Sequence, residues 1–354
     1  MPLIRILSAV EQVAANLREE MLRGHWSGFM PGVDALAPEL GVSRKTVEAA
    51  LRLLEKEGLL VGQGPRRRRR IELDASIAPA ALRIAILADE TAIRRPRYIV
   101  EAMHELLEAG HSASFAPGNM YELGKDPKRI ARMVGKTEAD AWVVMSGPRD
   151  VLEWFSENDK PTLALFGRRH GLPIAGVGPD KAGAYASATN ALIKLGHRRI
   201  VLLARRMSRV PDPGQSENAF LNELESNGIP PSSYNLPDWT ESVDGLHSRL
   251  ESLFRVTPPT ALIVDEAPVF AAVQQFLAQR KILVPQDISV VCTDADATFA
   301  WCKTSVAHIR WDSKPLVSRI VRWAANVSRG KKDLRQTVTS AKFVTGGTMG
   351  PAKG

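Results

Sequence analysis

Near the start of the chain, the apolar side chains are spaced as on one face of a helix. Between residues 8 and 24 they recur every three or four positions, which predicts a helix with a single buried side. Ser8 and Glu11 have the spacing of a capping box at its start. A second, shorter helix is predicted over about 34–40, followed by a turn over 41–43.

A third helix is predicted to begin after Ser43, which can serve as its N-cap, and to end at Gly58. Its apolar positions again share one face. The opposite face is mostly basic and carries one small residue: Lys45, Ala49, Arg52 and Lys56. Two helices joined by a three-residue turn, with a basic second helix, form a helix-turn-helix arrangement.

The segment after the third helix has the pattern of a hairpin, or wing. An apolar strand over 59–61 is followed by a Gly- and Pro-containing turn over 62–65. Five consecutive arginines, residues 66–70, then lead into a returning strand over 71–73. An isolated arginine run is typical of a solvated loop or flexible tail, but in a wing it can pair with phosphates or enter a narrow minor groove.

The basic charge of this region is confined to one stretch. The whole chain of 354 residues has a net charge of +8. Residues 1–43 sum to −2, whereas 44–70 carry nine basic residues against three acidic ones, a net of +6. The position of this charge favours a polyanionic partner at the third helix and the wing.

These features resemble the winged-helix domain of the GntR family of bacterial transcription regulators, and we assign residues 1–73 to such a domain. The matching stretches are 17–24, 36–47 and 50–60. The resemblance implies that Arg44 and Thr46 contact DNA and that the wing at Gln63 and Gly64 reaches the minor groove. The chain departs from the family at Asp34, where an arginine is usual, and at the wing tip, Gly64-Pro65-Arg66. The candidate DNA-binding residues are Arg44, Lys45, Thr46, Arg52, Gln63, Gly64, Arg66, Arg67 and Arg68.

After a small, proline-containing linker over 74–81, the pattern changes to apolar runs alternating with amphipathic helices. The runs are 82–87, 141–145, 162–166, 200–203, 261–264 and 288–291. Strands of this kind are typical of a parallel sheet covered on both faces. The length of 82–350 favours two doubly wound α/β lobes, with ligand bound at the carboxyl ends of the strands.

This second part resembles the effector domain of LacI/GalR regulators, which has the fold of periplasmic sugar-binding proteins. The resemblance rests on residues 178–183 with 195–200, on 284–291 with Asp294, and on 259–263. It implies that Asp180 and Asp294 bind ligand hydroxyls. Ser216 stands where the family has an arginine, and Asp265-Glu266 replaces an Asn-Asp pair. The candidate effector-binding residues are Asp180, Ser216, Asp265, Asp294 and Trp301; Phe299 and Trp301 are equally compatible with a packing role.

Composition narrows the functional class. The chain lacks an apolar run long enough to span a membrane, and a secretory signal is not expected. Its two cysteines, Cys292 and Cys302, are expected to be buried thiols in a cytoplasmic protein. No catalytic or metal-binding signature is present, so an enzyme, a metal site and a cofactor are not expected.

The sequence therefore predicts a homodimeric repressor that binds double-stranded operator DNA and responds to a sugar or sugar derivative. The altered effector positions leave open a regulator with a degenerate site that responds to a protein partner or to no small molecule.

Overall fold

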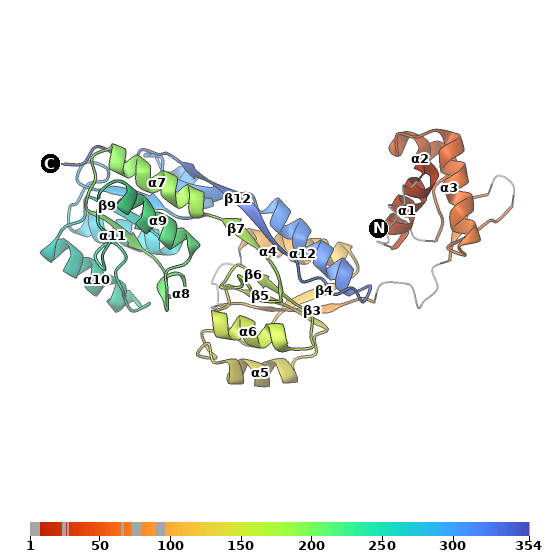
Figure 1. Ribbon diagram of the computed structural model, residues 1–354, viewed down its shortest axis with the longest axis horizontal. Helices are drawn as coiled ribbons and strands as arrows, with labels where there is room; N and C mark the ends of the chain where they lie inside the picture. Colours follow the sequence, from red (N-terminus) through yellow and green to blue (C-terminus); the bar gives the residue numbers. More distant parts are fainter. Residues whose placement is uncertain are drawn as a thin grey trace, which may run out of the picture. The chain divides into compact units, whose positions relative to one another are not determined.

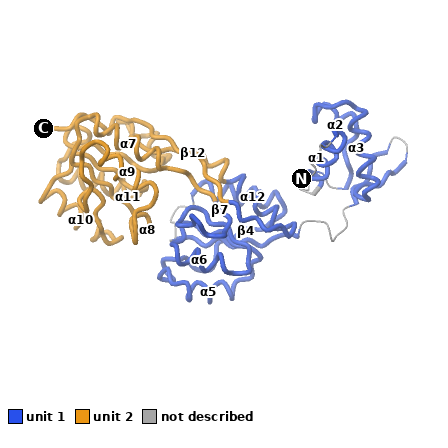
Figure 2. The backbone as a smooth tube through the Cα atoms, viewed as in Figure 1, with its two compact units in different colours: residues 1–176, 317–335 blue, residues 177–316, 336–354 orange. Residues whose placement is uncertain are grey.

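The computed structural model describes residues 8–22, 26, 28–64, 67–72, 80–89 and 96–353. Two compact units are distinguished, Met1–Gly176 with Val317–Arg335 and Val177–Leu316 with Gln336–Gly354 (Figure 2). The chain therefore passes between the units at three points. Most of the predicted linker, residues 74–79, and Arg66 of the wing lie outside the described residues.

The N-terminal part of the first unit has the predicted winged helix-turn-helix (Figure 1). Its elements are α1 (Ala9–Leu22), α2 (Val33–Glu39), α3 (Arg44–Lys56), β1 (Leu60–Val61) and β2 (Arg70–Ile71). The predicted capping box is confirmed: the backbone N–H of Ser8 donates to Glu11 at 2.8 Å, and that of Glu11 donates to the Ser8 hydroxyl at 3.3 Å. Gly58, with φ of +74°, ends the third helix as expected.

A small apolar core holds these elements together. The helix faces predicted to be buried are buried, among them Leu17, Leu36, Leu51 and Leu54. Leu59 and Leu60, which lead into the wing, join the same cluster. The inner face of α3 is therefore fixed against α1, α2 and β1, which leaves its basic face exposed to solvent.

The rest of the first unit contains a parallel sheet with strand order β4-β3-β5-β6. The strands are β3 (Arg83–Leu87), β4 (Ser112–Phe115), β5 (Ala141–Met145) and β6 (Thr162–Leu165). Helices α5 (Pro127–Lys136) and α6 (Arg149–Glu157) pack on one face, where Trp142 and Phe155 are buried. Helices α4 (Arg97–Glu108) and α12 (Lys314–Val327) lie on the other side of these strands (Figure 1).

The second unit repeats this architecture, with strand order β12-β11-β10-β9-β8. Its elements are β7 (Ala175–Asp180), which begins in the first unit, α7 (Ala182–Lys194), β8 (Ile200–Leu203), α8 (Arg206–Arg209), α9 (Gln215–Ser226), α10 (Val243–Val256), β9 (Ala261–Val264), α11 (Ala267–Gln279), β10 (Ser289–Cys292), a 3-10 helix (Ala297–Trp301), β11 (Ala307–Trp311) and β12 (Gln336–Val344). Strands β8 to β11 are parallel, and β12 pairs with β11 in the antiparallel sense.

Alternate residues of these strands enter two different cores. Ile200 and Leu202 pack with α7 and α9, whereas Val201 and Leu203 pack with α10 and α11. Because both faces are covered by helices, both sets of side chains are apolar, which is why the strands read as continuous hydrophobic runs. The predicted doubly wound α/β class is therefore confirmed, with one antiparallel strand, β12, as the exception.

No helix in the described part of the chain is both long and apolar enough to cross a lipid bilayer.

Candidate nucleic-acid interface and effector site

The start of α3 is fixed by the N-cap that the sequence predicted. The Ser43 hydroxyl accepts the backbone N–H of Thr46 at 3.2 Å and lies 2.8 Å from the Thr46 hydroxyl. This cap satisfies a helix N–H that would otherwise lack a partner and fixes the position of Thr46 in the first turn. The three residues proposed to begin the DNA contact, Arg44, Lys45 and Thr46, thus stand on a well-defined helix end.

The outer face of α3 is basic and accessible. Arg44, Lys45 and Arg52 are exposed, and Ala49 between them is half-buried. Arg52 forms an exposed ion pair with Glu48 one turn earlier, at 3.4 Å. A helix with this face can enter the major groove of DNA, with its N-terminal residues toward the base edges.

The wing is a hairpin attached to the body of the domain. Leu60 pairs with Ile71 and Val61 with Arg70. Phe29 forms a further bridge to Arg70, and the N–H of Met30 donates to the carbonyl of Arg69 at 2.9 Å. Two segments therefore flank the returning strand, which limits the movement of the wing.

The arginines of the wing have different environments. Arg67 and Arg68 are exposed near the tip, as are Gln63 and Gly64. Arg69 is instead inserted between two glutamates of α3: its Nη2 lies 2.9 Å from Glu48 and its Nε 2.8 Å from Glu55. The side chain is only 20% exposed, so its role is structural. Sequence reasoning treated the run as a single basic feature and missed this distinction.

In the second unit, the effector candidates Asp180, Asp265 and Asp294 lie at or just after strand ends, whereas Ser216 and Trp301 lie on helices. Asp180 ends β7, and its Oδ1 accepts the N–H of Ala182 at 3.1 Å, so the carboxylate caps the start of α7 while remaining exposed. Ser216 is half-buried in the first turn of α9. Asp180 therefore lies where a strand of such a sheet ends, whereas Ser216 lies on a helix beyond α8.

Asp294, just beyond β10, is paired with a lysine that the sequence analysis did not single out. Lys181 Nζ lies 2.6 Å from Asp294 Oδ1 and donates to the carbonyl of Thr293 at 3.1 Å. Burial by itself would lower the pKa of Lys181, but the negative charges of Asp294, Asp265 and Glu266 outweigh it, and the pKa of Lys181 is raised. The ammonium group therefore stays charged and partly neutralises Asp294.

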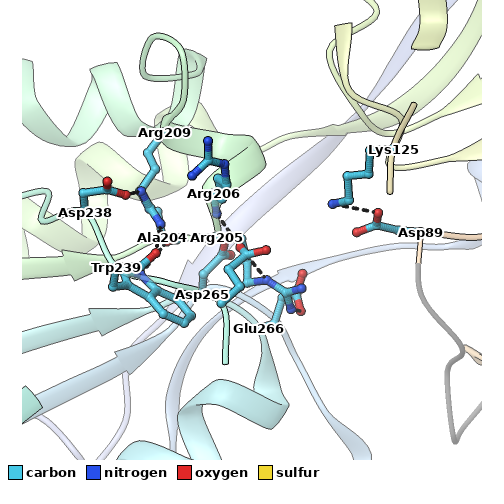
Figure 3. A network of polar contacts seen from close by, with 11 residues as sticks. Asp89, Lys125, Ala204, Arg205, Arg206, Arg209, Asp238, Trp239, Asp265 and Glu266 are labelled. Atoms are coloured by element: carbon cyan, nitrogen blue, oxygen red, sulfur yellow. Dashed lines mark hydrogen bonds and ion pairs between the residues drawn. The ribbon is translucent and has the colours of Figure 1, made fainter. Parts of the chain in front are cut away.

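Asp265, after β9, is the centre of a second polar cluster (Figure 3). It is only 7% exposed. Its Oδ1 accepts the Thr293 hydroxyl at 2.7 Å, and its Oδ2 accepts the backbone N–H of Arg205 at 3.1 Å. Arg205 in turn donates to Glu241 at 3.0 Å and to Glu266 at 2.8 Å. Asp265 thus ties together the loops that follow β8, β9 and β10.

Phe299 and Trp301, the two aromatic candidates on the 3-10 helix, have different environments. Phe299 packs edge-on against Phe270, with ring centroids 5.5 Å apart, and so has the packing role that the sequence left open. Trp301 is 90% exposed. Cys292 is buried as expected, but the same expectation was wrong for Cys302, which is exposed because it directly follows the short 3-10 helix at the surface.

The first unit has polar and aromatic contacts of its own, which were not predicted from the sequence. Lys125 and Asp89 form an ion pair at 2.9 Å (Figure 3). Phe166, directly after β6, packs edge-on against Tyr98 of α4 with centroids 5.7 Å apart. At Gly167, with φ of +73°, a side chain would lie 2.5 Å from the carbonyl oxygen of Gly147, so only glycine allows the loops after β5 and β6 to approach.

In the described part of the chain, no cluster of three or more His, Cys, Asp or Glu side chains is placed to hold a metal ion.

Comparisons with known proteins agree with this geometry. Residues 9–67 match the model of the bacterial regulatory proteins of the gntR family, and residues 189–349 match that of the periplasmic binding protein-like domain. No curated protein matches the chain.

Three solved structures illustrate the likeness in fold. A transcriptional regulator CelR–cellobiose complex is 17% identical, with a TM-score of 0.64 over 90% of this chain and 100% of that chain. A LacI family regulator from Enterococcus faecium with bound ribose is 16% identical, with a TM-score of 0.60 over 77% of this chain and 100% of that chain. The Escherichia coli transcriptional repressor ascG is 16% identical, with a TM-score of 0.58 over 76% of this chain and 99% of that chain. The chain thus joins a gntR-family DNA-binding domain to a periplasmic-binding-protein-like domain, which is the composition of a transcription regulator and not of an enzyme.

Proposed function

We propose that this protein is a ligand-responsive transcription regulator that binds a specific operator through α3 and the wing. The observation that carries the proposal is the exposed basic face of α3 beside a wing that is held to the same helix by Arg69. In this proposal Arg44, Lys45, Thr46 and Arg52 lie in the major groove.

The wing reaches the adjacent minor groove through Gln63 and Gly64 and through the arginines 66–68. Arg67 and Arg68, which are exposed, bind phosphates or a narrow groove without requiring a particular base. Sequence preference then comes from α3, and much of the affinity comes from the wing.

The DNA proposal is tested by selection from a random duplex pool with the full chain, followed by footprinting of the enriched sites. We expect enrichment of a near-palindromic site. An Arg44→Ala variant would lose the sequence preference at the base position that Arg44 contacts. Recovery of unrelated sequences by the wild-type chain would contradict the proposal.

We further propose that the effector is a sugar or sugar derivative and that the regulated genes serve carbohydrate uptake or catabolism. The proposal is supported by the fold shared with structures named as holding cellobiose and ribose. Carboxylates at strand ends, such as Asp180 and Asp294, suit hydroxyl groups, and an exposed aromatic side chain in the same unit, Trp301, suits the apolar face of a sugar ring.

A thermal-shift screen with cellobiose, ribose and sugar phosphates tests the effector class. A stabilising sugar would support it, because a ligand that binds only the folded state raises the melting temperature. If no sugar stabilises the protein, the alternative of a degenerate site is favoured. The observation behind this alternative is that Asp265 and Asp294 already bond to other side chains of the protein.

We propose that the regulator acts as a homodimeric repressor in the bacterial cytoplasm. Helix α4 supports the dimer, since Val100 and Leu107 are exposed two turns apart on one face. Sedimentation of the wild-type chain and of a Val100→Asp, Leu107→Asp variant tests this. A wild-type monomer would contradict the dimer, and reporter expression that is unchanged when the protein is removed would contradict repression.

A further inference from the structure

The helix that precedes the recognition helix begins with a carboxylate beside the first arginine of α3. Asp34 lies in the first turn of α2, and Arg44 is the first residue of α3. Asp34 Oδ1 and Arg44 Nη2 are 2.6 Å apart, and the side chains are 75% and 72% exposed. The packing of Leu36 and Leu51 in one core holds the two helices, and therefore these two residues, in place.

A carboxylate in the first turn of α2 is favoured by the helix dipole, but the ion pair with Arg44 adds little to this. An ion pair so exposed contributes little to folding because water screens it and two long side chains must be ordered. The carboxylate also lies next to the proposed DNA surface, where phosphates repel it and so weaken binding to any sequence. A benefit to DNA recognition can come from the effect of the carboxylate on Arg44.

Arginine reads guanine through two parallel hydrogen bonds to O6 and N7, which requires the planar guanidinium to be held in one orientation. A guanidinium has five N–H donors, so a bond from Nη2 to Asp34 is compatible with a second edge facing a base. A neighbouring carboxylate also reduces the attraction of Arg44 to phosphates.

We propose that Asp34 is a positioning residue that orients Arg44 toward a guanine in the operator and lowers its affinity for other DNA. This inference rests on the proposed DNA-binding function. It assigns a role to the position at which this chain departs from the arginine usual in similar domains.

The test uses selection from a random duplex pool with full-length wild type, Asp34→Asn, Arg44→Ala and, as a matched control, Glu39→Gln. The control removes the same charge from the exposed end of the same helix. Thermal melts check that every variant folds, as expected for exposed positions. Binding to one unrelated duplex at low salt is measured in parallel.

We expect the wild type to prefer guanine at one position of each half-site and Arg44→Ala to lose this preference. Asp34→Asn should weaken the preference at the same position by at least about fivefold, leave the other positions unchanged and bind unrelated DNA at least as tightly as the wild type. Glu39→Gln should keep the wild-type preference.

Three results would overturn the inference. If Asp34→Asn keeps the guanine preference that Arg44→Ala loses, Asp34 does not position Arg44. If it changes a different base position, Asp34 itself reads a base. If the wild type selects no sequence, both the proposed function and this inference fail. In the first two results the wild type still selects a site, so only the inference fails.

Discussion

Arg69 Nη2 lies 2.9 Å from Glu48 Oε1, so a residue of the wing is bound directly to the recognition helix. The same guanidinium donates to Glu55 two turns further along α3. Burial opposes the charge of Arg69, but the two glutamates outweigh this effect and the pKa of Arg69 is raised. The run of five arginines therefore includes one residue that anchors the wing and, among the described residues, two at the tip that face solvent, Arg67 and Arg68.

Replacing Arg67 and Arg68 with alanine should weaken binding to all DNA sequences about equally. Each lost phosphate contact lowers the slope of log affinity against log salt by about 0.9, so the double variant should lose about one to two units of slope. Fluorescence anisotropy over a salt series measures this. Arg70→Ala is the control, because Arg70 is paired with Glu72; an unchanged slope in the double variant would show that the tip does not contact DNA.

Replacing Arg69 should act through the fold. Arg69→Ala leaves Glu48 and Glu55 close together without their shared cation, and we expect it to lower the free energy of unfolding by about 1–3 kcal/mol. Arg69→Lys should recover only part of this loss, because an ammonium lacks the planar fork that bridges two carboxylates. Urea unfolding followed by helix content tests the prediction; equal stability of all three proteins would contradict the anchor.

The Lys181–Asp294 pair should stabilise the second unit. Lys181→Met leaves Asp294, Asp265 and Glu266 without this cation, at an expected cost of about 1–3 kcal/mol. The raised pKa of Lys181 means that the folded state binds the proton more tightly. The stabilisation should therefore be complete below the ordinary lysine pKa of about 10.4 and decline as pH rises through the higher folded value.

Unfolding measured from pH 7 to 11 for wild type and Lys181→Met tests this dependence. The difference between the two proteins should be constant at low pH and shrink at the alkaline end. A difference that grows with pH would contradict the assigned role. Lys194→Met, at the other end of α7, is the control for loss of a lysine.

The two cysteines should react with thiol reagents at very different rates. Burial raises the pKa of Cys292 to about 12, so at pH 8 only about one thiol in ten thousand is ionised. Cys302 is exposed. One thiol per chain should therefore react quickly in the folded protein and two in denaturant. A Cys302→Ser variant that still reacts quickly would show that the core around Cys292 is open.

The elements predicted well from the sequence are those whose packing gives their apolar residues a clear spacing along the chain. The buried face of α3 has the spacing of a helix, and strands such as Ile200–Leu203 are apolar throughout because helices cover both sides. Strand β4, Ser112–Phe115, was missed because polar residues alternate along this exposed edge. The apolar runs also give no bounds for helices such as α5 and α6, which are short and rich in charged residues.

Several residues of the candidate sites were predicted from the sequence, but the contacts between their side chains were not. Asp265 and Asp294 were found because they follow strands, and Lys181 and Arg205 could have been found by the same rule, since they follow β7 and β8. That Lys181 pairs with Asp294 could not be read from the sequence, because the pair depends on the order of strands in the folded sheet. The anchor formed by Arg69 was missed for the same reason.

If a small molecule controls binding to DNA, the affinity of the full chain for its operator depends on that molecule. The affinity of the full chain for its selected operator should be measured with and without the sugar that stabilises it most, at fixed salt. We expect a change of about fivefold or more, the range typical of coupled sites, and a smaller change for unrelated DNA. The same operator affinity at saturating sugar would contradict it.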